Sequence, residues 1–552
     1  MCDSTNAKQA IQAILQRTQE NTLRAWRGHE RELLIELVRT LDLTAFAFTL
    51  APNRQVLVTQ DAERHAMLVG AATAMLPLLK ILHDDSGGVP WGPAEPVLVE
   101  YADEYLIKCG KLAHLRRILE LERFGLAKAS FVRPDHLIIR VMPETQEAED
   151  RHSQAQIDAY LETPEEMGTF EEAELVSRID GYTDVHDNWF IRYDPDHETF
   201  AYHRQLAAQR ARSFAEAQAL PPRTILGGRS FQEWTGLSTS AQGRVLHHIA
   251  CATRLRATHD NLELRNLLTV FARKEDIVAV LQQSGERFEN ARLAMSLMIL
   301  DTETAAWYEQ QHEIPLPYYI DFGRDFVLLP CFAGLLNPYA GLTWKLRTMY
   351  RPDWDRGVDG REGIFRTDLR IAFPPPRFLV SQTGFTLRRQ NGEKITDIDA
   401  VVVDREAGSL ALMQLKWHDI FGRSLRERQS RMRNLLEAND WVQRVSDWVA
   451  KRSARDLGVA FNLGTIAGNK EPILFVLTRH TARFTGATTY DPRAAWLGWA
   501  QLLPAAQRRD VPDILRTIFE QFRGATKRHE PPERTSTVEF HLPDLFVEVI
   551  ID

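Results

Sequence analysis

Four polar side chains fall at matched places in two neighbouring apolar runs of the sequence. Asp397 and Asp399 are two residues apart in the first run, and Gln414 and Lys416 are two apart in the second. Residues two apart on a β-strand share one face. If the runs pair, two carboxylates, an amide oxygen and an ammonium group lie together. Such groups can hold a divalent cation and stabilise negative charge that develops during hydrolysis.

The sequence around these residues predicts a β-hairpin. The runs 394–404 and 410–417 are rich in β-branched and apolar residues, and the five residues between them include Gly408. This composition is typical of two antiparallel strands joined by a short loop. The apolar parts of both runs are expected in the interior, where a lysine is costly without a carboxylate partner. A surface hairpin carrying ordinary exposed ion pairs is the simpler alternative.

The hairpin resembles the core of the PD-(D/E)XK nuclease superfamily, in the Mrr-like variant where glutamine replaces the acidic residue before x-Lys. The matching residues are Asp399 and then Gln414, Leu415 and Lys416, and the resemblance covers residues 345–552. It implies Mg²⁺ or Mn²⁺ as the cofactor, held by Asp399, Gln414 and the carbonyl of Leu415. Lys416 would position or activate the attacking water and stabilise developing charge.

The resemblance also implies an acidic residue from a helix upstream of the hairpin. Glu362 is the candidate for this catalytic and metal-binding role, and Asp359 and Asp368 are its rivals. Gln414 offers the metal a neutral oxygen, so affinity for the cation should fall unless Asp397 or Glu362 compensates for the missing charge. Asp397 is otherwise expected to support the site from outside the set of ligands.

A basic helix is predicted to follow the hairpin and to contact nucleic acid. Apolar residues at helical spacing from Leu425 to Val449 predict that one face of this helix is buried against the sheet. Its arginines would contact a duplex backbone, with affinity that depends strongly on salt and little on sequence. A solvated face with ordinary ion pairs is the alternative. The arginines are Arg423, Arg426, Arg428, Arg431 and Arg433.

The whole chain is predicted to be a multi-domain α + α/β protein. Residues 1–142 are expected to form an α-helical domain with a short β element, and residues 157–340 a second, mainly α-helical domain. Residues 345–552 are expected to form a restriction-endonuclease-like α/β domain with a central mixed sheet. That sheet would include a buried strand at 473–478 and a final strand at 545–551.

Two local predictions in the C-terminal domain concern the approach to the hairpin. Residues 352–357 contain proline, aspartates and glycine and predict a turn. Residues 377–383 and 385–389 predict two paired strands that break at Gly384.

Other polar segments predict no second site. His247 and His248 lie in an apolar helix and are expected to be structural. Residues 464–470 lack the glycine spacing of a phosphate-binding loop, so no built-in NTPase is expected.

Composition narrows the class of protein and its compartment. The 552 residues carry a formal net charge of -8 at pH 7, so any contact with phosphates must come from a local basic surface. The four cysteines lie far apart, which argues against a zinc knuckle or a disulfide framework and suits a reducing cytosol. No signal peptide and no membrane span are expected. We expect a soluble, cytoplasmic protein with no membrane partner.

The predicted function is a metal-dependent nuclease that hydrolyses phosphodiester bonds, with DNA favoured over RNA. A large helical region joined to such a nuclease is typical of bacterial restriction or antiphage defence, an analogy at the level of the fold. The helical region would bind a protein partner or form a homo-oligomer. One alternative is a catalytically inactive nuclease-fold protein that acts as a nucleic-acid-binding or protein-interaction scaffold. The other is a helical adaptor that binds only a partner protein.

Overall fold

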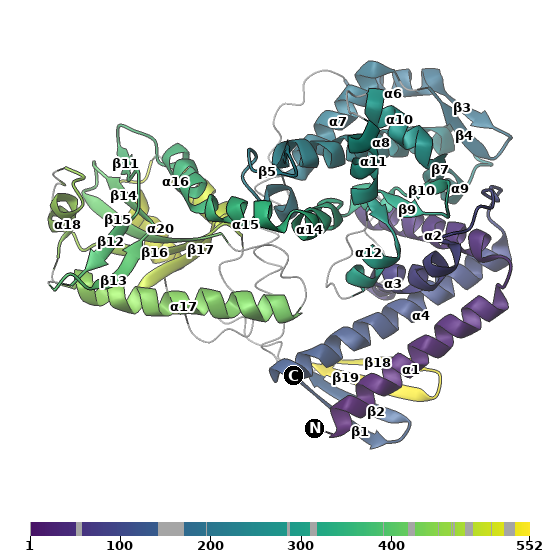
Figure 1. Cartoon of the computed structure of the whole chain (residues 1–552), viewed down its shortest axis with the longest axis horizontal. Coiled ribbons are helices and arrows are strands. Elements are labelled where there is room, and N and C mark those ends of the chain that lie inside the picture. The colour runs from purple at the N-terminus through teal and green to yellow at the C-terminus, as the bar shows by residue number, and fades with distance from the viewer. Residues whose placement is uncertain are drawn as a thin grey trace.

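The chain folds into two lobes that lie side by side in Figure 1. The helical lobe contains the described residues up to 359 together with residues 536–551, and the sheet lobe contains the described residues of 361–523. The computed structural model of the chain describes residues 2–50, 58–141, 171–194, 196–212, 214–283, 288–309, 317–389, 391–417, 425–450, 452–464, 466, 470–480, 490–508, 510–523 and 536–551.

The helical lobe is dominated by long helices, as its apolar periodicity predicts. The helices are α1 (Cys2–Ala25), α2 (Glu30–Leu50), α3 (Val58–Leu82), α4 (Pro96–Leu121), α6 (Glu172–Tyr182), α7 (His197–Ala211), α8 (Phe231–Thr258), α9 (Leu264–Leu268), α10 (Lys274–Gln283), α11 (Phe288–Leu297), α12 (Thr302–Tyr308), α13 (Phe332–Leu335), α14 (Tyr339–Met349) and α15 (Arg351–Asp359), with short 3-10 turns at Glu122–Phe124 and Ala215–Gln218.

Small sheets complete the helical lobe. One sheet has the order β7 (Val270–Arg273), β10 (Phe326–Leu329), β9 (Tyr319–Asp321) and β8 (Ile299–Leu300). Two further pairs are β3 (Thr183–His186) with β4 (Phe190–Tyr193), and β5 (Ile225–Leu226) with β6 (Arg229–Ser230).

A single apolar core runs through most of the helical lobe. Its buried residues extend along the chain from Ala7 to Leu335, so the predicted boundary at 143–156 does not divide it. Polar contacts cross the same boundary, since Arg265 Nε donates to Glu36 Oε1 and the Thr269 hydroxyl donates to Asp42 Oδ2. The two predicted helical domains therefore share one core.

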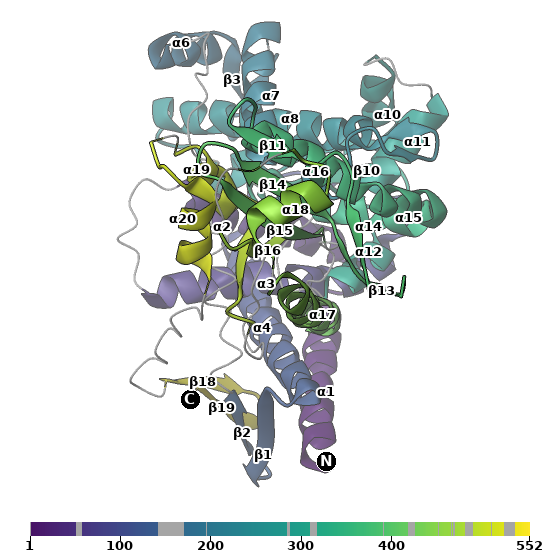
Figure 2. The same ribbon diagram turned by 90° about the vertical axis from the view of Figure 1, so that its left-hand side faces the viewer.

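The C-terminal strand lies in the helical lobe and not, as predicted, in the sheet of the C-terminal domain. The sheet order is β1 (Ala127–Arg133), β2 (His136–Val141), β19 (Leu545–Ile551) and β18 (Ser536–Leu542), with β19 parallel to β2. Both views show the yellow strands beside β1 and β2 (Figures 1 and 2). The fully buried Val547 pairs with the fully buried Leu137. The alternating apolar residues of β19 thus complete an N-terminal sheet.

Among the described residues, one helix, α3, is long and apolar enough to cross a membrane by length and composition alone. Its stretch Ala62–Leu82 is 61% buried inside the protein, where α3 packs against α2 and α4. Mostly buried core helices of soluble proteins also meet this test of length and composition.

The sheet lobe contains the predicted central mixed sheet. Its order is β11 (Phe378–Val380), β14 (Ala400–Asp404), β15 (Ser409–Lys416), β16 (Ile473–Thr478) and β17 (Ala494–Gly498). β14 pairs antiparallel with β11 and with β15, whereas β16 pairs parallel with β15 and with β17. β12 (Phe385–Arg388) and β13 (Lys394–Ile398) form a separate pair.

Helices cover both faces of this sheet. One apolar cluster packs α16 (Arg361–Ala372), α19 (Trp499–Ala506) and α20 (Ile514–Phe522) on one face. A second cluster packs α17 (Leu425–Val449) and α18 (Ala454–Ala460) on the other, and α17 runs along the lower edge of the lobe in Figure 1. Because the central strands are covered on both sides, they are apolar almost throughout.

The predicted hairpin is confirmed, with one change. β14 and β15 pair with Ala400 opposite Met413, and Gly408 takes a φ of 65° in the loop, where glycine carries no Cβ penalty. The first run, however, is two strands. It breaks at Asp399, so that β13 turns away to pair with β12 while β14 stays in the central sheet.

Two local predictions before the hairpin are wrong. Residues 352–357 lie in helix α15, because a proline in the first turn is compatible with a helix and Trp354 is fully buried against the helical lobe. The strands at 378–380 and 385–388 do not pair with each other. β11 joins β14 and β12 joins β13.

Candidate functional site

The break at Asp399 places its carboxylate beside the end of β15. The Asp399 N–H donates to Met413 O at 3.0 Å, and the Leu415 N–H donates to Asp399 Oδ2 at 2.7 Å. The side chain is therefore held by the backbone of the strand that carries the glutamine and the lysine. No donor from the described residues contacts the other oxygen, Oδ1, so that oxygen can bind another group.

Gln414 carries a buried oxygen without a hydrogen-bond partner. Successive residues of a strand point to opposite faces of the sheet. Met413 and Leu415 pack on the face covered by α16, so Gln414 and Lys416 lie on the face covered by α17. The Gln414 Oε1 atom is buried and accepts no hydrogen bond within the described part of the chain. Leaving a buried acceptor unpaired costs about 1–3 kcal/mol. A cation or a water bound there would remove that cost.

The carbonyl of Leu415 faces the same region. The Lys416 oxygen accepts from the Arg479 N–H at 2.9 Å, so it points toward β16. Adjacent strand residues direct their N–H and C=O groups to opposite sides. The Leu415 carbonyl therefore points away from β16, to the side where its own N–H meets Asp399.

Glu362, and not either of its rivals, lies beside Asp399. Arg366 Nη1 donates to Glu362 Oε1 at 2.5 Å and to the main-chain oxygen of Asp399 at 3.0 Å, which ties the start of α16 to the hairpin. Asp368 instead pairs with Arg479 at 2.7 Å, and Asp359 is exposed at the end of α15. The structure thus brings Glu362 together with Asp399.

The electrostatics distinguish the two aspartates of the hairpin. Burial raises the pKa of Asp399 to about 6. The Leu415 N–H, Lys416 and Arg366 lower it, and the negative charge of Glu362 raises it further. The pKa of Asp397 is lowered, because Lys394 and the Thr386 hydroxyl bind its carboxylate. The ionised form of Asp399 is therefore destabilised in the fold, whereas that of Asp397 is stabilised.

The residues present fit a hard cation bound by two carboxylates and two neutral oxygens. Within the described residues no three His, Cys, Asp or Glu side chains gather around one point. A cation here would be held by Asp399 and Glu362 with the oxygens of Gln414 and Leu415. Mg²⁺ is commonly bound by one or two carboxylates and keeps several waters, which matches this donor set. Glu362 would first have to leave Arg366.

Of the five arginines predicted to contact nucleic acid, only Arg433 has a described side chain. Arg423 lies outside the described residues, as do the side chains of Arg426, Arg428 and Arg431. Arg433 is exposed on α17. The opposite face of this helix is buried as predicted, and Trp441 donates from Nε1 to Asp397 O at 2.7 Å.

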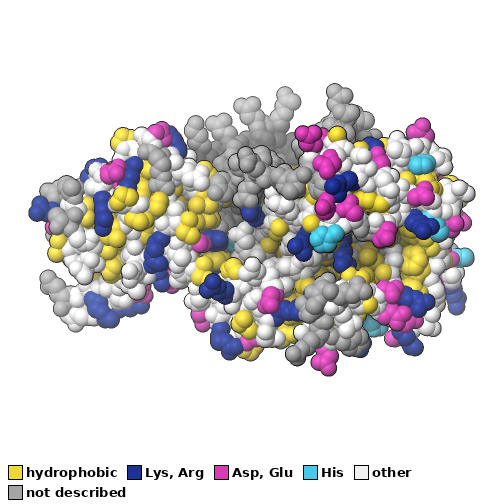
Figure 3. All heavy atoms as spheres, turned by 90° about the horizontal axis from the view of Figure 1, so that it is seen from above, with side chains coloured by type: hydrophobic (Ala, Val, Ile, Leu, Met, Phe, Trp, Pro, Cys, Tyr) yellow, Lys and Arg dark blue, Asp and Glu magenta, His cyan; other side chains and the backbone are white. Residues whose placement is uncertain are grey.

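Charge is divided unevenly between the lobes. Residues 361–523 contain 26 Lys and Arg against 18 Asp and Glu, whereas the rest of the chain contains 41 against 57. On the face in Figure 3, dark blue side chains predominate over magenta ones on the sheet lobe at the left, and the two are mixed on the helical lobe. The acidic total of the chain therefore conceals a basic sheet lobe.

Three arginines near the site were not singled out from the sequence. Besides Arg366, the buried Arg361 donates from Nη2 to Ala219 O at 2.6 Å and from Nη1 to Trp417 O at 3.3 Å. Arg479 lies over the Trp417 ring at 4.8 Å. Arg366 could have been found from its spacing of four residues after Glu362, which places both on one helix face. The bonds of Arg361 to the helical lobe carry no comparable sequence signal.

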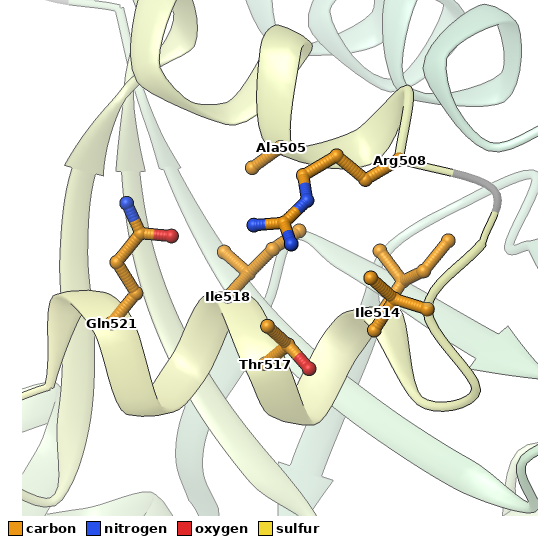
Figure 4. A pocket seen from close by; sticks show the side chains of 7 residues that line it. Ala505, Arg508, Ile514, Thr517, Ile518 and Gln521 are labelled. Carbon is orange, nitrogen blue, oxygen red and sulfur yellow. The ribbon is translucent and has the colours of Figure 1, made fainter.

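A small pocket elsewhere in the sheet lobe does not contribute to this site. It lies between α19 and α20, and the Arg508 side chain extends into it above Ile518 (Figure 4). Its volume of about 10 Å³ is roughly that of one water. No residue of the candidate site lines it.

Comparisons of the chain with family models, with curated proteins and with solved structures found no match.

Proposed function

We propose that the protein is a metal-dependent nuclease of the PD-(D/E)XK type that hydrolyses phosphodiester bonds in DNA. The observation that carries this proposal is the buried Oε1 of Gln414, which accepts no hydrogen bond within the described residues, on the strand whose backbone holds the costly carboxylate of Asp399. A purely structural hairpin has no use for either group. Both become favourable when a divalent cation binds between them.

The order of elements supports the same proposal. A helix (α16) is followed by three antiparallel strands of one sheet (β11, β14, β15), a helix (α17) and a parallel strand (β16). This is the arrangement that the resemblance implies for a restriction-endonuclease-like domain. Asp399 comes directly before β14, and Gln414 to Lys416 end the antiparallel strand β15, so these candidate residues gather at one end of two central strands, to which α16 adds Glu362.

Each residue has a distinct role in the proposed reaction. Asp399, Glu362, Gln414 and the Leu415 carbonyl would hold Mg²⁺ or Mn²⁺, which when bound supplies Lewis acidity and lowers the pKa of water. Lys416 orients the attacking water and stabilises the negative charge on phosphate. The water oxygen forms a bond to phosphorus, the ester P–O bond breaks, and the proton of the water leaves to solvent or to the departing oxygen.

Lys416 has the freedom that this role requires. It forms no ion pair with a carboxylate of the described residues, although its charge lowers the pKa of Asp399. An ammonium group near a carboxylate, but not bound to it, can turn toward a substrate.

The basic sheet lobe supports nucleic acid as the substrate. Its excess of Lys and Arg provides the local positive surface that an acidic protein needs to bind phosphates. DNA is proposed ahead of RNA on the family resemblance alone. A cytoplasmic role in bacterial restriction or antiphage defence, with the helical lobe binding a protein partner or a second copy, is proposed on the same analogy.

The test is cleavage of plasmid and linear DNA by the purified full chain with Mg²⁺ or Mn²⁺. Asp399→Ala and Lys416→Met should each lower the rate at least about 100-fold. Lys394→Met is the matched control, because Lys394 is an exposed lysine of the neighbouring strand paired with Asp397. It should cut like wild type, and EDTA should stop all cleavage. Wild-type cleavage no faster than that of either site variant, across both metals, would refute the proposal.

One observation favours the inactive scaffold as the second candidate. Glu362 is bound to Arg366 and so is not directed to a metal. A scaffold that binds nucleic acid would keep salt-sensitive DNA affinity without cleavage. An adaptor that binds only protein would show no such affinity, so DNA binding at two salt concentrations separates these alternatives.

A further inference from the structure

Arg366 joins the two acidic residues of the candidate site. It contacts the carboxylate of Glu362 and the main-chain oxygen of Asp399 through the same nitrogen, Nη1. Its side chain is only 16% exposed, and its Nε is buried without an acceptor within the described residues. A nearly buried guanidinium with an unused donor is costly. A surface pair between residues four apart on a helix would not bury the cation in this way.

The charges of the four groups balance without a metal. Asp399 and Glu362 supply two negative charges, and Lys416 and Arg366 supply two positive ones. Addition of a divalent cation would leave an excess of two positive charges. Attack of hydroxide on a phosphodiester builds up two negative charges, so the loaded site would match the transition state in charge. Without Arg366 the match would be one charge short.

We propose that Arg366 exchanges partners. In the metal-free protein it neutralises Glu362, and in the loaded protein it binds a phosphate oxygen of the substrate after Glu362 has turned to the metal. Arg366 would keep its bond to the main-chain oxygen of Asp399 in both states, because that bond does not involve either carboxylate. The inference rests on the proposed function and extends it by assigning a substrate-binding residue.

Two opposite effects of one substitution test this exchange. Arg366→Gln removes a positive charge close to the metal and frees Glu362, so the Kd for Mn²⁺ measured by calorimetry on the full chain should fall about ten-fold. The same variant should cut an oligonucleotide duplex at least about 100-fold more slowly, because the phosphate loses its cation. A residue that only supports the fold would weaken both properties together.

Two further variants complete the experiment. Arg370→Gln is the matched control, since Arg370 lies one turn further along α16 and donates to the main-chain oxygens of Ser381 and Gln382. It should leave both measurements within about three-fold of wild type. Arg366→Lys keeps the charge but loses the fork of donors, so Mn²⁺ affinity should hardly change while cleavage slows about ten-fold.

The outcomes separate this inference from the proposed function. Tighter Mn²⁺ binding with slower cleavage in Arg366→Gln supports the exchange. If the wild type binds Mn²⁺ and cuts DNA, but Arg366→Gln binds Mn²⁺ no more tightly than the wild type, the exchange is overturned and the proposed function stands. If Arg366→Gln does not fold, unchanged cleavage by Arg366→Lys overturns it. A wild-type protein that neither binds Mn²⁺ nor cuts overturns the proposed function, and the exchange with it.

Discussion

Replacement of Asp399 by Asn should stabilise the metal-free protein. The pKa of Asp399 is raised to about 6 in the fold, chiefly by burial, from an ordinary value of 3.8. A raised carboxyl pKa means that the cost of ionisation is absent below about pH 4, grows between pH 4 and 6, and is complete above that. Each pKa unit corresponds to about 1.4 kcal/mol, so the ionised carboxylate costs about 3 kcal/mol at pH 7.5.

Asparagine should remove this cost and keep the local structure. Its Oδ1 can accept the Leu415 N–H that Asp399 Oδ2 accepts, and its amide carries no charge against Glu362. Asp399→Asn should therefore raise the free energy of unfolding by about 2–3 kcal/mol at pH 7.5 with EDTA present, and by little near pH 4.5. Urea unfolding at the two pH values measures both differences.

The matched control is Asp397→Asn, two residues earlier. Because Lys394 and Thr386 bind Asp397 and lower its pKa, its loss should destabilise the protein slightly, by less than about 1 kcal/mol. Mg²⁺ should raise the unfolding temperature of wild type and of this control but not of Asp399→Asn. If Asp399→Asn is less stable than wild type in EDTA at pH 7.5, Asp399 is not held ionised at a cost, and the reasoning is refuted.

Three further predictions follow from other parts of the structure. Gln414→Glu should tighten Mn²⁺ binding about ten-fold by adding a ligand charge, and should destabilise the metal-free protein by repulsion from Asp399; calorimetry and urea unfolding would check the two effects. Burial lowers the pKa of His248 to about 4 from 6.5, so stability should fall as pH drops below about 6.5, by about 2 kcal/mol at pH 5; His248→Gln should flatten this part of the stability curve. Deletion of residues 536–552 should expose the apolar edge of β2 and lower the unfolding temperature of the full chain, whereas an unchanged temperature would contradict the pairing of β19 with β2.

The site hairpin was predictable because strand alternation is local information. The spacing of Gln414 and Lys416, the apolar content of both runs and Gly408 in the loop together specify two paired strands. The basic helix and the buried strand at 473–478 were predictable from periodicity for the same reason. His247 and His248 are buried and hydrogen-bonded to Tyr182, Tyr193 and backbone oxygens, as expected of structural residues.

The break at Asp399 was not predictable from alternation. The run from 394 to 404 is a continuous β pattern, and only the pairing of β12 with β13 shows where it divides. The strand at 545–551 has the apolar pattern of any sheet strand, so its sequence cannot specify which of two sheets it joins. Helix α15 depends on burial of Trp354 by the helical lobe, which is a tertiary contact.

The arginines around the site were missed for a different reason. Cations that neutralise metal ligands belong to no family motif, although the four-residue spacing between Glu362 and Arg366 does place these two on one helix face. Arg361 joins the end of β15 to the helical lobe only because Ala219 and Trp417 come together in the fold. The charge division between the lobes, in contrast, was open to simple counting once the lobe boundary was known.

The central claim is that one divalent cation binds between Asp399 and Gln414. Anomalous scattering from crystals of the full chain soaked in Mn²⁺ tests it most directly. The expected result is a single strong peak within about 2.5 Å of Asp399 Oδ1, Gln414 Oε1 and the Leu415 oxygen, with Glu362 turned away from Arg366. A map without a peak at these residues, at Mn²⁺ concentrations that support DNA cleavage, would contradict the claim.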